Sequence, residues 1–303
     1  MLVFFLSTVS PLGCTVAEPT DTSTGADSGS DSGADSGGDA DGVRTLANCG
    51  GSFGDGTPAF FSRYFACLDI SADDDTVLIR THDLPPHLTY YYGEDAENYV
   101  AWDDRGGDYH PNPSTLDEQD ITLRIPKEPV AKGIVIDETL VDLEAETSDD
   151  EYHLGPAGVA LDSVEYFNAT AAPGDDILDE QWTFDTYEAH PAGPEYHYHV
   201  DSPGPLEVLV DRGIISAPTN GSADIELYGI MCDGTVLLGC TELDGSAADA
   251  TDFDAQNGHV GDIVDEAGTT HFSARYHVHL CDALGHYGLA PEIQYYETCD
   301  ILR

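Results

Sequence analysis

Hydrophobic residues in this chain of 303 residues come in short runs, which Gly, Pro, Asp and Ser interrupt roughly every 8–15 residues. The runs are rich in Val, Ile, Leu and Tyr, and no long stretch repeats its apolar positions with the helical period of about 3.6 residues. They cover residues 75–84, 119–126, 132–143, 158–167, 205–213, 225–240, 274–280 and 292–298. This pattern predicts an all-β body with long loops, built as a β-sandwich or a barrel-like domain.

The first 44 residues differ from this body. Residues 1–14 are a short apolar run that ends in Leu-Gly-Cys, which resembles a bacterial lipoprotein signal with Cys14 as the lipidated residue. An ordinary secretory signal is the alternative, and the run is too short to span a bilayer as a helix. Residues 15–44 are rich in Asp, Ser and Gly, so we expect a disordered tether before a folded body over 45–303. These features predict an exported, membrane-anchored lipoprotein that touches the membrane only through its N-terminal lipid.

The cysteines support export. Without Cys14 six remain, an even number, which predicts up to three disulfides in an oxidising compartment. Pairing sequence neighbours gives Cys49–Cys67, Cys232–Cys240 and Cys281–Cys299, one of the 15 pairings that six cysteines allow.

The charge balance excludes several partners. The chain has 10 Lys and Arg against 58 Asp and Glu, a net charge of −48, so nucleic acid and anionic membrane surfaces are not expected partners. Clustered carboxylates make calcium a possible ligand, although no D-x-D-x-D-G loop of the EF-hand kind is present. The remaining explanation of this acidity is a heavily hydrated surface, as in a high-salt setting.

An internal repeat lies within the body, in copies at about 152–202 and 223–285. Four landmarks recur in the same order and with similar gaps. They are Gly158 to Asp162 and Gly229 to Asp233, then Phe184-Asp185 and Phe253-Asp254, then His190 and His259, and last Tyr196-His197-Tyr198-His199 and Tyr276-His277-Val278-His279. The repeat predicts two similar β units related by a pseudo-twofold axis.

The last landmark carries the candidate chemistry. In a strand, residues i and i+2 share a face about 6.5–7 Å apart, so both imidazoles of a His-x-His pair reach one ion. The expected metal ligands of the first unit are His190, His197 and His199, with Asp185 as a ligand or a partner of an imidazole. Those of the second unit are Asp254, His259, His277 and His279. Nitrogen donors with one carboxylate suit zinc or copper, and iron also fits. His82 and His87 are further candidates.

Two other interpretations of the histidines stay open. They are a structural hydrogen-bond network that locks the two units together, and acid–base catalysis without metal.

The order and spacing of the landmarks in the repeat resemble those of the YHYH-domain proteins, a family of exported bacterial proteins that are often lipoproteins. The tetrapeptide at 196–199, the segment THDLPPH at 81–87 and G-x-A-L-D at 158–162 carry the resemblance, which covers roughly residues 75–285. Val278 in the second tetrapeptide and Asp162-Ser163 in place of Asn-Gly depart from the family pattern, which implies a weaker second site. The resemblance implies a fold, an exported location and candidate residues, but no reaction.

Several enzyme classes lose support. The chain has no H-E-x-x-H, no Walker loop and no G-x-G-x-x-G, and it has only two lysines. We therefore expect an exported surface lipoprotein that binds transition-metal ions. The alternatives are a metal-dependent hydrolase or oxidoreductase, and a structural or adhesive module with packed histidines. Whether the protein is an enzyme stays open, and no protein partner is predicted.

Overall fold

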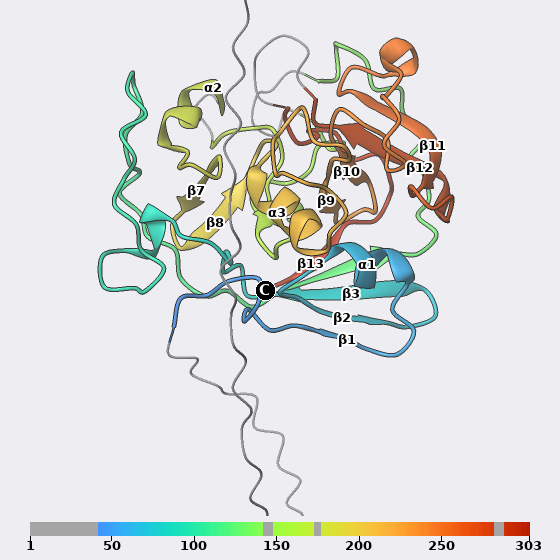
Figure 1. Ribbon diagram of the computed structural model, residues 1–303. Coiled ribbons are helices and arrows are strands. Elements are labelled where there is room, and N and C mark those ends of the chain that lie inside the picture. The colour runs from blue at the N-terminus through green and yellow to red at the C-terminus, as the bar shows by residue number, and fades with distance from the viewer. Residues whose placement is uncertain (1–41, 142–147, 173–176, 282–287) are drawn as a thin grey trace, which may run out of the picture. The chain divides into compact units, whose positions relative to one another are not determined.

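The computed structural model describes residues 42–141, 148–172, 177–281 and 288–303. The predicted signal segment with Cys14 and most of the predicted tether lie outside these residues, as do 173–176 of the first repeat copy and 282–285 of the second. The described residues belong to a compact unit that begins at Asp41. Its strands form two mixed sheets, which confirms the all-β class (Figure 1).

The smaller sheet has five strands in the order β1-β2-β3-β4-β13. Burial alternates along β3 and β4, so Val77, Ile79, Leu123 and Ile125 point inward, as expected for a sheet with one buried face. Only β1 and β2 pair in parallel. The strands are β1 (Ser52–Phe53), β2 (Asp69–Ala72), β3 (Thr76–Thr81), β4 (Ile121–Pro126) and β13 (Asp300–Leu302).

The larger sheet has eight strands in the order β11-β12-β10-β9-β5-β6-β8-β7. They are β5 (Gly158–Ala160), β6 (Glu165–Tyr166), β7 (Ala189–Ala192), β8 (Glu195–Tyr198), β9 (Leu227–Met231), β10 (Val236–Leu238), β11 (Gly258–Val264) and β12 (Thr270–His279). From the central pair β5 and β9 outward, each half has an antiparallel, a parallel and an antiparallel pairing. This order matches what two repeated units would form, while duplication itself stays a prediction.

One hydrophobic core joins the two sheets. It includes Ile79 and Leu123 of the smaller sheet together with Val159 and Ile230 of the larger one. The helical segments are short: α1 (Ala59–Tyr64), α2 (Ile177–Glu180) and α3 (Pro203–Asp211), with single 3₁₀ turns η1 (Tyr90–Tyr92), η2 (Gln181–Thr183) and η3 (Ala250–Asp252). In the described part of the chain, no helix is long and apolar enough to cross a membrane.

Three of the eight apolar runs that we expected to form strands do not form them. Residues 205–213 lie largely in helix α3, because Ser202 caps the helix by accepting a hydrogen bond from the Gly204 amide and Pro203 starts it. The buried Leu206 and Leu209 are then one helical turn apart. The runs at 132–143 and 292–298 contain no strand within the described residues, only isolated bridges at or beside them.

All six cysteines of the body form disulfides, but two of the three expected pairings are wrong. Cys49–Cys67 is confirmed, whereas the other bridges are Cys232–Cys299 and Cys240–Cys281. Sequence neighbours fail as a guide because β10 and β12 lie side by side in the sheet, which brings Cys240 to Cys281 although 41 residues separate them. Three disulfides indicate an oxidising, extracytoplasmic environment.

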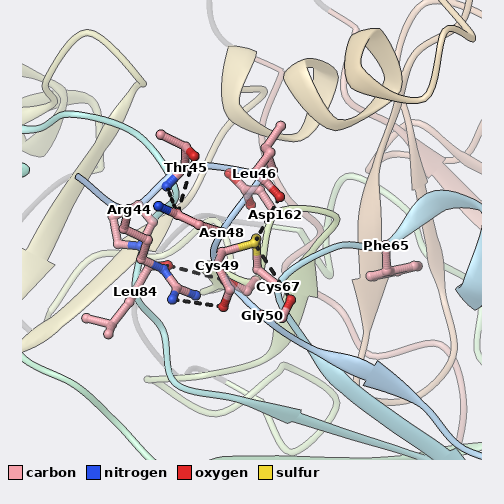
Figure 2. Close-up of a disulfide and its surroundings, with 12 residues drawn as sticks. Arg44, Thr45, Leu46, Asn48, Cys49, Gly50, Phe65, Cys67, Leu84 and Asp162 are labelled. Atoms are coloured by element: carbon pink, nitrogen blue, oxygen red, sulfur yellow. Dashed lines mark hydrogen bonds between the residues drawn. A yellow bond between two sulfur atoms is a disulfide. The ribbon is translucent and has the colours of Figure 1, made fainter. Parts of the chain in front are cut away.

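The folded body begins before residue 45, as contacts of Arg44 near the Cys49–Cys67 disulfide show (Figure 2). Arg44, predicted to lie in the tether, donates hydrogen bonds to the carbonyls of Leu84 (3.1 Å) and Cys49 (3.0 Å), and its amide donates to Asn98 Oδ1 (2.6 Å). These contacts fix Arg44 to the folded unit, so the boundary at residue 45 is corrected to include it.

Candidate metal centres

Strands β7 and β8 form one end of the larger sheet, and β11 and β12 form the other (Figure 1). A histidine cluster lies at each end, on these strands or directly after them. His190 of β7 lies opposite His197 of β8, and His259 of β11 lies opposite His277 of β12. Cross-strand partners share a face, and they form one row across all eight strands. The row is His190, His197, Glu165, Val159, Ile230, Val236, His277 and His259. Both clusters therefore lie on the same face of the sheet. Five neighbouring strand pairs separate β8 from β12, and at about 4.8 Å between neighbouring strands the two clusters are about 24 Å apart.

We call His190, His197 and His199 the first cluster. One nitrogen from each comes within 4.8 Å of the others, and the Nε2 atoms of His197 and His199 are 3.0 Å apart. The Nδ1 atoms point away from the cluster. Those of His197 and His199 lie 3.0 and 2.6 Å from the backbone carbonyls of Glu195 and Asn168. The first cluster brings together the three histidines expected from the sequence.

Burial keeps the first cluster neutral. It lowers the pKa of His190 and His197 well below the usual range, and it lowers the pKa of His199 to about 4. Neighbouring imidazoles add to this effect at His190 and His197, because like charges repel. A neutral imidazole is the form that binds a metal ion, so these residues are ready to act as ligands at neutral pH.

We call His259, His277, His279 and Glu242 the second cluster. Its ligand atoms also lie within 4.8 Å of one another, and Nε2 of His279 is 3.3 Å from Nε2 of His259. The Nδ1 atoms of His277 and His279 contact the carbonyls of Arg275 (3.0 Å) and Gly239 (2.7 Å). Again the Nε2 atoms face each other. With four members, the second cluster is the larger one, and the weaker second site that the resemblance implied stays a prediction.

Glu242 supplies a carboxylate at the centre of the second cluster. Its oxygens are 3.5 Å from Nε2 of His259, His277 and His279. Burial raises the pKa of Glu242, but contacts with the imidazoles of His277 and His279 outweigh burial and bring the pKa well below its usual range. In the first cluster, Glu180 is the comparable residue, 3.5 Å from His190 Nε2 and 3.9 Å from His199 Nε2.

Asp185 and Asp254, expected beside the imidazoles, do not belong to either cluster. Asp185 Oδ2 accepts a hydrogen bond from the Tyr196 hydroxyl (2.7 Å), and Asp254 Oδ2 accepts one from the Tyr276 hydroxyl (2.7 Å). Alternate residues of a strand point to opposite faces, so the tyrosines draw both carboxylates to the far side of the sheet. We therefore revise the carboxylate partners from Asp185 and Asp254 to Glu180 and Glu242.

Sequence reasoning missed both glutamates. Each lies in the connection between the second and third strand of its half, but Glu180 precedes Phe184 by four residues and Glu242 precedes Phe253 by 11. Because these spacings differ, aligning the two repeat copies by their landmarks does not bring Glu180 and Glu242 to the same position. The shared signal is only a Glu in corresponding connections, and the first connection also contains Glu188.

The remaining candidate histidines lie elsewhere. His87 is buried and stacks on Tyr187 with ring centroids 3.4 Å apart, and burial lowers its pKa to about 3. His82 pairs with the exposed Glu118 at 3.0 Å. Neither residue belongs to a cluster, so their expected role as further ligands gains no support from the geometry.

One serine-hydrolase pattern also escaped the sequence reasoning. Residues 50–54 read G-G-S-F-G, which fits G-x-S-x-G. Ser52 lies in edge strand β1, and its hydroxyl donates to Asp69 Oδ1 at 2.6 Å. The pattern needs a tight strand-to-helix turn and a histidine base, and among the described residues no histidine contacts Ser52.

A pocket reaches the first cluster. It has a volume of ≈ 480 Å³, and its wall includes all three histidines together with Glu180, Glu195 and Arg303. A ligand in this pocket would lie beside the three histidines. No protein-family model, curated protein or solved structure matches this chain.

Proposed function

We propose that this chain is an exported metal-binding protein of the YHYH type that holds one transition-metal ion, zinc or copper, in each histidine cluster. Lipidation of Cys14 anchors it to the bacterial membrane in this proposal. The oxidising environment that the three disulfides indicate supports an exported location. The nitrogen-rich ligand sets favour zinc and copper over calcium, which prefers oxygen.

The facing Nε2 atoms carry this proposal. Where Nδ1 donates its proton to a backbone carbonyl, the neutral ring leaves a lone pair on Nε2. In the first cluster two such lone pairs meet at 3.0 Å, and in the second the Nε2 atoms of His279 and His259 meet at 3.3 Å. A cation between them removes the repulsion. Tetrahedral zinc ligands at about 2.0–2.1 Å are about 3.3 Å from each other, close to both distances.

The first experiment is elemental analysis of the folded unit, expressed without a His-tag in an oxidising compartment. We expect about two zinc or copper ions per chain. The double variants His197→Ala/His199→Ala and His277→Ala/His279→Ala should each hold about one ion, because the clusters are separate. The double variant His82→Ala/His110→Ala is the matched control, since both residues lie outside the clusters. A folded, metal-free protein that takes up no added zinc or copper would overturn the proposal.

The pocket favours a second candidate function at the first cluster only. A metal-dependent hydrolase or oxidoreductase needs a metal position open to substrate, and the ≈ 480 Å³ pocket provides such access to His190, His197 and His199. Activity that depends on the first cluster and survives loss of the second would support the enzyme. The structural or adhesive alternative requires histidines that pack without metal, which the same elemental analysis tests.

A further inference from the structure

Two carboxylates are buried between the smaller sheet and the first half of the larger sheet. Asp83 follows β3 and Glu165 begins β6, and both residues are 0% exposed. Within the described part of the chain, Asp83 Oδ2 and both side-chain oxygens of Glu165 have no hydrogen-bond partner. Buried charged groups are normally paired or bound to a metal ion, so these three oxygens require an explanation.

Backbone contacts hold the two residues against each other. Asp83 Oδ1 accepts a hydrogen bond from the Glu165 amide at 3.0 Å. Asp83 has a φ of 53°, a left-handed conformation that is unusual for a residue other than glycine, and the Thr81 hydroxyl fixes it by accepting from the Asp83 amide at 2.9 Å. Burial raises the pKa of both carboxyls well above their usual ranges, and at Asp83 the charge of Glu165 raises it further.

The fold does not require an acid at this position. Glu165 pairs across the sheet with Val159 and His197, and the corresponding residue of the second half, Val236, pairs with Ile230 and His277. Val236 is part of the apolar core. A valine therefore suits the same place between a central strand and a histidine strand, and Glu165 is a specific feature of the first half.

We propose that Asp83 and Glu165 form a third cation site, which adjoins the first histidine cluster at His197 but has its own ligands, and that it takes a hard divalent cation, Ca²⁺. The three unpartnered atoms of Asp83 and Glu165 are all carboxylate oxygens, the ligands that Ca²⁺ prefers, whereas the two histidine clusters are rich in nitrogen. A cation of charge +2 neutralises the two buried negative charges together. Glu195, which lines the neighbouring pocket, adds to the negative potential at Asp83.

The test is the melting temperature of the folded protein after chelator treatment, measured with and without calcium chloride. We expect Ca²⁺ at about 100 times its Kd to raise the melting temperature by about 5 °C. Glu165→Val, which copies Val236, and Asp83→Asn should each abolish this rise. Glu165→Val inserts the residue that the second half already accommodates, so we expect it to fold.

Glu94→Gln is the matched control, because Glu94 is an exposed acid and its loss removes one surface charge without touching the site. This variant should keep the full rise with Ca²⁺. An equal rise in wild type, Glu165→Val and Asp83→Asn would show Ca²⁺ acting only on the acidic surface and would overturn the site. No rise in wild type would also overturn it and would mean that the carboxyls hold protons instead. Zinc stoichiometry is measured separately, so either result leaves the proposal for the histidine clusters unaffected.

Discussion

At the scale of single residues, the backbone carbonyls behind the histidines set the chemistry of both clusters. The carbonyls of Asn168 and Gly239 contact Nδ1 of His199 and His279 at 2.6 and 2.7 Å. Because a carbonyl only accepts, the proton stays on Nδ1 and Nε2 faces the cluster. Asn168 lies three residues after Glu165, and Gly239 lies three residues after Val236, the counterpart of Glu165 in the second half. The two halves therefore use corresponding main-chain positions to orient the ring in the same way.

Glu242→Gln tests the carboxylate of the second cluster. Gln keeps the shape of Glu but lacks its negative charge, so we expect zinc affinity at this cluster to fall roughly 10–100-fold. Competition with a chromogenic chelator measures the change, in a His197→Ala/His199→Ala background that leaves one cluster. Glu118→Gln, an exposed acid beside His82, is the control. Unchanged affinity in Glu242→Gln would remove this residue from the ligand set.

Asp162→Asn tests a buried acid at the repeat landmark. Asp162 accepts a hydrogen bond from the Tyr198 hydroxyl at 2.9 Å, and burial raises its pKa from 3.8 to about 7. The Asp162 carboxyl therefore binds its proton more tightly in the folded state than in the unfolded state. The stability that protonated Asp162 contributes is lost as the pH rises from about 4 to 7. Asn does not titrate. We expect the variant to gain about 1.4 kcal/mol over wild type per pH unit in this window, and no further gain above it.

Urea unfolding at several pH values measures this difference, and comparing the two proteins cancels every other titrating group. Parallel stability profiles for wild type and Asp162→Asn would mean that Asp162 is ionised throughout the window.

At the scale of elements, the larger sheet depends on close contact between its two central strands. Gly229 of β9 lies opposite Ala160 of β5, and a Cβ atom at Gly229 would lie 2.3 Å from the Val159 carbonyl oxygen. This contact is with backbone, which has little room to move. The glycine landmark of the repeat therefore marks the place where the two halves meet.

Gly229→Ala should destabilise the protein by about 3 kcal/mol, because the added methyl group forces the central strands apart. Gly54→Ala is the control, since its added Cβ would lie 3.3 Å from the Ser71 side chain at the edge of the smaller sheet. We expect a much smaller loss there. Urea midpoints of both variants check the prediction, and equal losses would contradict it.

Sequence patterns predicted these elements well where the information is local. Short apolar runs identified β3, β4 and the second half of β12. The two His-x-His pairs and the histidines expected beside them, His190 and His259, all lie in the two clusters. The pattern failed at α3, where an apolar run with a Ser-Pro start is compatible with either structure. Glu180, Glu242 and the disulfide partner of Cys232 depend on contacts between segments far apart in sequence, which no local pattern contains.

At the scale of the whole molecule, disulfides and charge act in opposite directions. A net charge of −48 favours expansion through self-repulsion. The bridges Cys49–Cys67, Cys240–Cys281 and Cys232–Cys299 link residues 18, 41 and 67 positions apart and restrict the unfolded chain. The chain thus combines a strongly hydrated surface with covalent ties inside.

Loss of the longest bridge should cost the most. In the chain-entropy description, removing Cys232–Cys299 by replacing both residues with Ser costs about 4 kcal/mol, against about 3 kcal/mol for Cys49–Cys67. Urea unfolding of the two double Ser variants at fixed salt measures both losses. A larger loss for the Cys49–Cys67 variant would contradict the ranking and would point to the contacts of Arg44 instead.

The position of each cluster on an outer hairpin has a consequence for local opening. The edge strands β7 and β11 pair on one side only, so their amides should exchange with solvent through separation of the hairpin rather than global unfolding. A metal ion held jointly by His190 and His197, or by His259 and His277, ties the edge strand to its neighbour. Zinc at 100 times its Kd should then slow amide hydrogen exchange in β7 and β11 about 100-fold, while exchange in the central strands β5 and β9 stays unchanged. Metal occupancy would thereby determine whether the ends of this sheet open and close on their own.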